Sequence, residues 1–298
     1  MDIDLKRKTL MAPSVNRITL VTFTYPNEGA DVILKDWIDF VGDSLSSVMV
    51  VSPACFEDSP VFKRWKTLSP MLEFLFIGEV DQHPDQYYAL GVLTAMAQVP
   101  TEYCLFVKLD VLPFRHGNDR WVVEGIEKII AMEAFALTGS ERWPGTDVID
   151  PQYGKTHRIS LNFALYQPKR YLEIIQASNP RFVKLAHECK VRFEDRFSLE
   201  SGIEEWLEAT GGFNLVRQED DDWSVFHIHQ FDDALRRIRE LYRDRICIDA
   251  FLNRIDPDRK EPWEYHPWER YYGMPRPWLL KRIRILCGEL RRRIFSSQ

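Results

Sequence analysis

Apolar runs that predict buried strands alternate with helical patterns along the first third of the chain. A β-branched run at 17–24 ends in the turn Tyr25–Gly29, and apolar positions at helical spacing follow over 30–43. The same alternation predicts further elements, namely strands at 48–51, 74–77 and 102–113 and a helix at 84–98. Because strands that alternate with helices form a mostly parallel sheet with right-handed crossovers, we expect an α/β fold.

After Pro113 the predicted strands become shorter and the connections longer. The patterns predict helices at 119–132, 168–177, 197–210 and 231–245, and strands at 134–138, 159–166, 213–216 and 224–229. The polar stretch 139–157 is predicted to be a loop, and loops of that length in compact domains often act as lids or acceptor sites. We expect three parts: an N-terminal extension at 1–16, a main domain at 17–230 and a helical extension at 231–298.

Composition narrows the class of protein. A net charge of −6 over 298 residues gives no reason to expect nucleic acid binding. The five cysteines are widely spaced and never form a C-x-x-C pair, which argues against a disulfide framework or a cysteine zinc site and favours a reducing compartment. The first eight residues are too charged for a signal peptide, and no apolar run reaches transmembrane length. We therefore expect a cytoplasmic protein.

Asp110 is the first candidate for chemistry, because it closes the buried run 102–113 just before Pro113. Open α/β sheets bind their ligands at the carboxyl ends of such strands. A carboxylate at that point could hold a divalent cation against a diphosphate. The alternative is that Asp110 only begins a turn.

The order and spacing of elements over 17–230 resemble the GT-A fold glycosyltransferases, especially the family-2-like enzymes of bacterial surface polysaccharide synthesis. The resemblance rests on the turn after the first strand, on Lys108-Leu109-Asp110 at the position of a D-x-D motif, and on an acidic helix that ends at Gly211. It implies a GT-A-like (Rossmann-like) mixed, mostly parallel sheet flanked by helices, with a helical C-terminal extension. It also implies transfer of a sugar from a nucleotide-diphosphate donor to a saccharide or lipid-linked acceptor hydroxyl.

The same resemblance implies positions that contact the donor, which are Thr24, Tyr25, Ser52, Asp85, Lys108 and Asp110. The last Asp of the D-x-D motif is retained, but the first is Lys108. One carboxylate must share a Mn²⁺ or Mg²⁺ ion with phosphate oxygens, water or another ligand. His227 and His229 lie on one face of a predicted strand and could complete such a site, as a histidine does in some GT-A enzymes. Alternatively, Lys108 contributes charge to the diphosphate, or forms an ion pair with Asp110 along one face of the strand.

The family's catalytic base is a carboxylate near the start of a helix, about eleven residues before a Gly. Glu200 stands at that interval before Gly211, and Asp195 in the upstream Glu194-Asp195 pair is the substitute. Such a base deprotonates the acceptor hydroxyl if the reaction inverts. The alternative is that Glu200 only stabilises the helix N-terminus. Trp143 and Asn162 lie around the expected acceptor region and are predicted to bind the acceptor.

Residues 278–295 combine apolar positions at helical spacing with six basic residues. Such a helix can lie in an anionic membrane interface, which would place the protein at the inner face of the membrane, or it can pack on the domain. Two other functions stay open: an inactive glycosyltransferase-like binding or assembly subunit, which Lys108 would explain, and another nucleotide-using α/β transferase. Neither a G-x-G-x-x-G nor a Walker pattern is present, so dinucleotide and P-loop functions are poor fits.

Overall fold

A computed structural model describes residues 17–78, 87–139, 147–191, 198–220, 222–227 and 232–246. Contacts group the chain up to Asp244 into one compact unit and the chain from Arg245 into a second, and the fold below is that of the first unit. The helix α8 (Asp232–Arg243) belongs to this first unit, whereas the sequence pattern placed it at the start of the C-terminal extension.

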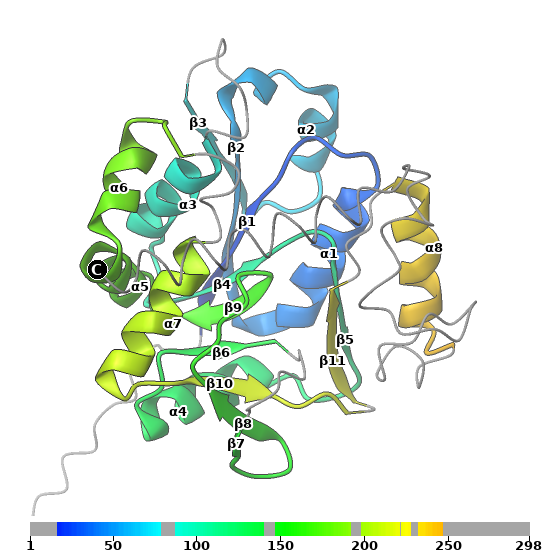
Figure 1. The fold of residues 1–298 in the computed structure, drawn as a ribbon. Coiled ribbons are helices and arrows are strands. Elements are labelled where there is room, and N and C mark those ends of the chain that lie inside the picture. The colour runs from blue at the N-terminus through cyan, green and yellow to red at the C-terminus, as the bar shows by residue number, and fades with distance from the viewer. Residues whose placement is uncertain are drawn as a thin grey trace, which may run out of the picture. The chain divides into compact units, whose positions relative to one another are not determined.

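Within the described residues, most strands join one sheet. Their bounds are β1 Ile18–Phe23, β2 Leu45–Pro53, β3 Leu72–Ile77, β4 Tyr103–Val107, β6 Ala136–Thr138, β7 Asp147–Val148, β8 Tyr153–Thr156, β9 Phe163–Tyr166 and β10 Asn214–Arg217. The order is β3-β2-β1-β4-β9-β6-β10-β8-β7, in which β1 to β4, β6 and β10 run in one direction and β9 and β8 run against them. This arrangement confirms the expected α/β fold class, a mixed, mostly parallel sheet flanked by helices (Figure 1).

Helices cover both faces of the sheet, which explains why β1 and β4 are buried along their whole length. Their bounds are α1 Ala30–Val41, α2 Pro60–Trp65, α3 Tyr87–Gln98, α4 Trp121–Met132, α5 Pro168–Ser178, α6 Pro180–His187 and α7 Ser198–Thr210. On one face α3, α5 and α7 pack in one apolar cluster with Phe106 and Tyr166 of the sheet. On the other face Trp37 of α1 stacks on Phe163, and Trp121 of α4 lies against the same ring.

A second, two-stranded sheet follows directly from β4. It pairs β5 (Val111–Arg115) with β11 (Trp223–His227) in antiparallel register. Helix α8 packs on this sheet through Tyr242, whose ring stacks on Phe226 and whose hydroxyl bonds Ser224. Arg239 of α8 forms an ion pair with Asp36, so that α8 is also attached to α1.

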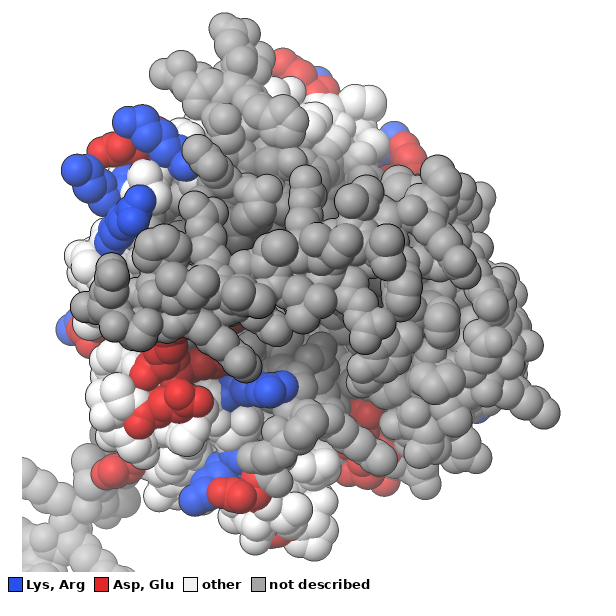
Figure 2. All heavy atoms as spheres, in the orientation of Figure 1, with Lys and Arg blue, Asp and Glu red and all other residues white. Residues whose placement is uncertain are grey.

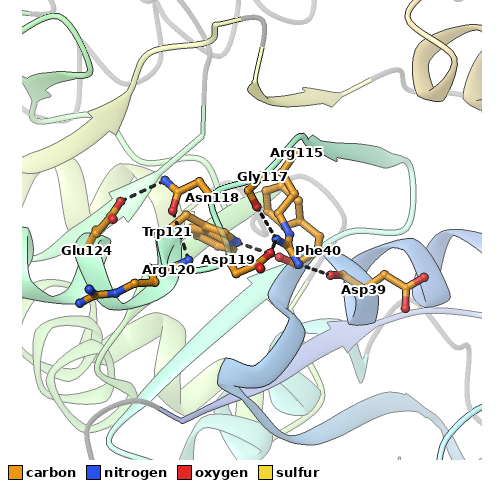
Figure 3. A network of polar contacts seen from close by, with 9 residues as sticks. All are labelled: Asp39, Phe40, Arg115, Gly117, Asn118, Asp119, Arg120, Trp121 and Glu124. Atoms are coloured by element: carbon orange, nitrogen blue, oxygen red, sulfur yellow. Dashed lines mark hydrogen bonds and ion pairs between the residues drawn. The ribbon is translucent and has the colours of Figure 1, made fainter.

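The far end of β5 is fixed to the helices on both sides (Figure 3). The Arg115 guanidinium donates to the Asp39 carbonyl at 2.9 Å and to the Gly117 carbonyl at 3.0 Å, and it pairs with Asp119. Trp121 at the start of α4 donates its indole N–H to the Phe40 carbonyl at 2.8 Å. The second sheet is therefore anchored at the end that lies away from Asp110.

Three local predictions differ from the structure. The run 102–113 is two strands: β4 ends at Val107, a turn spans Lys108–Asp110, and β5 begins at Val111. Lys108 and Asp110 therefore do not share a strand face. The stretch 139–157 was predicted to be a loop, yet it contains β7 and β8, because β8 pairs with β10. The short helices α2 and α6 were missed; each has a proline at its first position and a polar cap before it, Ser59 and Asn179.

Candidate functional site

Asp110 and His227 lie in contact at the carboxyl edge of the main sheet. The register of the second sheet places His227 opposite Val111, and this brings its ring beside the preceding residue, Asp110. His227 Nε2 lies 3.1 Å from Asp110 Oδ2, although the two residues are 117 positions apart. Both side chains are nearly buried, with exposed fractions of 8% and 11%. A carboxylate and an imidazole are thus held together at the edge where ligand chemistry is expected.

Asn162 contacts the other side of the same imidazole. Its amide nitrogen lies 2.9 Å from His227 Nδ1, and its backbone carbonyl accepts the Lys108 N–H at 3.0 Å. The pairing of β9 with β4 places Phe163 opposite Val107 and so sets Asn162 beside Lys108, while the pairing of β11 with β5 brings in the imidazole. The residue predicted to bind the acceptor therefore lies against a predicted metal ligand.

The turn that carries Asp110 is held from α1. Trp37 is fully buried, and its indole N–H donates to the Val111 carbonyl at 3.0 Å. The N–H of Val111 donates to the Lys108 carbonyl at 3.2 Å, which closes the turn. The backbone around Asp110 is therefore held by α1 and by the hydrogen bond that closes the turn.

Glu200 and Glu204, one turn apart on α7, bind the segment just before β9. Glu200 Oε1 accepts the Leu161 N–H at 2.8 Å, and Glu204 Oε1 accepts the Ile159 N–H at 3.3 Å. Burial raises the pKa of Glu204, and the nearby charge of Glu200 raises it further, while the Ile159 N–H lowers it. Acidic side chains gather over α7, whereas basic side chains gather over α6 (Figure 2). Glu200 thus lies next to the segment that carries Asn162.

Three of the predicted donor residues, Thr24, Tyr25 and Ser52, lie at the ends of β1 and β2. The Thr24 N–H donates to the Val51 carbonyl at 3.0 Å, and its hydroxyl donates to the Tyr25 carbonyl at 3.0 Å. The Tyr25 ring packs edge-on against Phe23, so its position is fixed. Ser52 is fully buried at the end of β2. Thr24 and Tyr25 remain predicted donor contacts, whereas the fully buried Ser52 side chain has no exposed surface with which to touch a donor.

Several predicted residues lie outside the described part of the chain. They are Asp85, Trp143, Asp195, His229 and the basic segment 278–295. In the ranges that the structure does describe, no helix has the length and apolar composition to cross a membrane.

Asp110 and His227 suit a hard or borderline divalent cation. An octahedral ion with bonds of about 2.0–2.2 Å places neighbouring ligand atoms about 3.0 Å apart. The two atoms that would bind it, Asp110 Oδ2 and His227 Nε2, are separated by 3.1 Å. Among the described residues, no three His, Cys, Asp or Glu side chains gather around one point. The two residues would therefore fill two positions, and a bound molecule or water would supply the others.

No protein-family model matches the chain, and no curated protein matches its sequence. Solved structures resemble its fold. The mannosyltransferase PcManGT from Pyrobaculum calidifontis, in complex with GDP-Man and Mn²⁺, is 15% identical with a TM-score of 0.44 over 76% of this chain. S. aureus TarS 1–349 in complex with UDP-GlcNAc is 11% identical, with a TM-score of 0.45 over 74% of the chain, and a UDP-glucose pyrophosphorylase complexed with UDP-glucose is 7% identical, with a TM-score of 0.44 over 71%. The chain spans 61%, 60% and 93% of these three proteins, respectively.

Sequence reasoning missed Trp37, Glu204 and the contact of Asn162 with His227. Trp37 read only as a core position of a helix, since nothing local indicates that an indole N–H meets a carbonyl 74 residues away. Glu204 could have been found, because it lies four residues after Glu200 and therefore on the same face of the helix.

Proposed function

We propose that this protein is a glycosyltransferase that uses a nucleotide-sugar donor. The contact between Asp110 and His227 carries the proposal, because it completes the ligand pair that Asp110 alone could not provide. The donor diphosphate would lie over the carboxyl ends of β1 and β4, beside Thr24 and Tyr25. A divalent cation, Mn²⁺ or Mg²⁺, would be held by Asp110 and His227, with His229 as a further candidate ligand.

The chemistry is a displacement at the anomeric carbon of the donor sugar. Glu200 would take the proton of an acceptor hydroxyl, whose oxygen then bonds to the anomeric carbon while the bond from that carbon to the diphosphate breaks. The cation, when bound, would stabilise the negative charge of the leaving diphosphate. Asp195 is the alternative base. An acceptor that is a saccharide or a lipid-linked sugar, as in surface polysaccharide synthesis, agrees with the resemblance.

The metal role is tested by replacing Asp110. Transfer and hydrolysis are measured for a panel of donors that includes GDP-mannose, UDP-glucose and UDP-GlcNAc, with and without Mn²⁺. We expect Asp110→Asn to lose at least about 100-fold in turnover, since it removes a charged ligand from the cation. Asp36→Asn is the matched control, because Asp36 is also a partly buried, ion-paired carboxylate. Full activity of Asp110→Asn would contradict the metal role.

The base role is tested with two variants of α7. Gln at position 200 can still accept the Leu161 N–H but cannot take a proton, so we expect Glu200→Gln to lower kcat while the affinity for nucleoside diphosphate stays the same. Glu204→Gln controls for the loss of a carboxylate on the same helix face and should keep its kcat. Equal kcat in both variants would exclude Glu200 as the base.

Calorimetry separates this function from its rivals. Binding of nucleoside diphosphate without turnover of any donor would favour an inactive binding or assembly subunit. If neither binding nor turnover is observed, the proposed function is refuted.

A further inference from the structure

The segment before β9 contacts three of the candidate residues, each on a different element. Leu161 donates its N–H to Glu200 of α7, and Asn162 binds Lys108 through its backbone and His227 through its side chain. Ser160 donates its N–H to the Thr138 hydroxyl at the end of β6, at 3.1 Å. The backbone of Asn162 and of the two residues before it is thus fixed by hydrogen bonds to three elements, and this fixes the point from which the Asn162 amide reaches the imidazole.

Both nitrogens of the His227 imidazole lie within hydrogen-bond distance of another side chain. Nε2 faces Asp110 at 3.1 Å, and Nδ1 faces the Asn162 amide nitrogen at 2.9 Å. In the arrangement seen, the amide N–H donates to Nδ1, so that the ring hydrogen lies on Nε2 and points to the Asp110 carboxylate. The Asn162 amide oxygen is buried and has no hydrogen-bond partner among the described residues.

We propose that Asn162 is a positioning residue that orients His227 for metal binding; this inference rests on the proposed function. A histidine that binds a metal through Nε2 carries its hydrogen on Nδ1, and that N–H needs an acceptor. The two ends of an amide have nearly the same shape, so a half-turn of the Asn162 side chain brings its unpartnered oxygen to Nδ1. One residue then holds the ring in the same orientation with either nitrogen protonated.

The prediction is tested by Mn²⁺ affinity, measured by calorimetry and by electron paramagnetic resonance in the presence of nucleoside diphosphate. Asn162→Leu removes the amide at similar size, and we expect the Kd for Mn²⁺ to rise about 10- to 100-fold, as for other residues that orient metal ligands. Asn162→Asp keeps an acceptor for the Nδ1 hydrogen, and we expect it to bind Mn²⁺ about as tightly as the wild type.

Asn214→Leu is the matched control. The Asn214 amide nitrogen donates to two backbone carbonyls, of His157 and Arg158, and its amide oxygen is also buried without a partner among the described residues. Asn214→Leu should therefore lower the thermal unfolding temperature and leave the Kd for Mn²⁺ unchanged.

The outcomes separate this inference from the function on which it rests. A wild-type protein that binds no Mn²⁺ would contradict the metal site itself. Wild-type binding together with an unchanged Kd in Asn162→Leu would overturn only the role of Asn162. An equal loss in Asn162→Leu and Asn162→Asp would also overturn it, because an acceptor for the Nδ1 hydrogen should preserve the affinity for Mn²⁺.

Discussion

Replacing Trp37 with Phe tests whether α1 holds the turn that carries Asp110. The indole is fully buried, and its N–H donates to the Val111 carbonyl at 3.0 Å. Phe removes roughly 50 Å² of buried apolar surface, which costs about 1 kcal/mol. The Val111 carbonyl also loses its indole donor, which costs about 1–3 kcal/mol more. We expect the free energy of unfolding to fall by about 2–4 kcal/mol.

Trp121→Phe is a close control for this change. Trp121 is equally buried, also contacts Phe163, and donates its N–H to the Phe40 carbonyl at 2.8 Å, on the side of the second sheet away from Asp110. Urea unfolding should show a similar loss of stability in both variants. Only Trp37→Phe should weaken Mn²⁺ binding, on the order of 10-fold. If the two variants bind Mn²⁺ equally well, Trp37 supports the core and not the site.

Three further changes follow from the structure. The pKa of Glu204 is raised by burial from its ordinary value of 4.5, so this carboxyl contributes to stability while it is protonated, and the contribution is lost as the pH rises through the raised pKa. Urea unfolding should therefore show that Glu204→Gln is more stable than the wild type at about pH 7 and equal to it at about pH 4; the opposite trend would refute this reasoning. Arg239→Leu breaks the ion pair with Asp36 and should lower the free energy of unfolding by about 2 kcal/mol. Arg243→Leu, at an exposed position, should change the same free energy by less than about 0.5 kcal/mol. Equal effects of the two changes would show that the Asp36 pair is not stabilising. Gly211 has a φ of +70° at the end of α7. Thermal unfolding should show that Gly211→Ala loses about 1–2 kcal/mol of stability and Gly211→Asn less, because Asn tolerates this conformation better. An Ala variant as stable as the wild type would exclude strain at this position.

The sheet could be predicted from the sequence because its central strands are buried on both faces. The runs at β1 and β4 are apolar throughout, and that pattern is local. The break at Val107 could not be read in the same way, because Val111 and Leu112 continue the apolar run while they leave the main sheet for the second one. The sequence therefore predicted correctly that Val111 and Leu112 are buried, but it placed them in the same strand as β4.

The candidate site depended on contacts that no local pattern encodes. Asp110 was singled out by its place at the end of a buried run and His227 through the resemblance, and the register of β5 with β11 decides that they meet. Asn162 was predicted to bind the acceptor from its position along the chain alone, and the structure adds that the pairing of β9 with β4 sets it beside Lys108 with its amide against the imidazole. The residue types were informative, but their partners depend on tertiary structure.

The two-stranded sheet has a consequence for the order in which the chain acquires function. Asp110 is synthesised more than a hundred residues before His227, and α8, which packs on β11, comes later still. A nascent chain can form β1 to β4 and most of their core before β11 exists. Contacts of such long sequence separation form late and slowly. Until β11 has been synthesised, Asp110 lacks its contact with His227, and the proposed cation site would form only after residue 227 has left the ribosome.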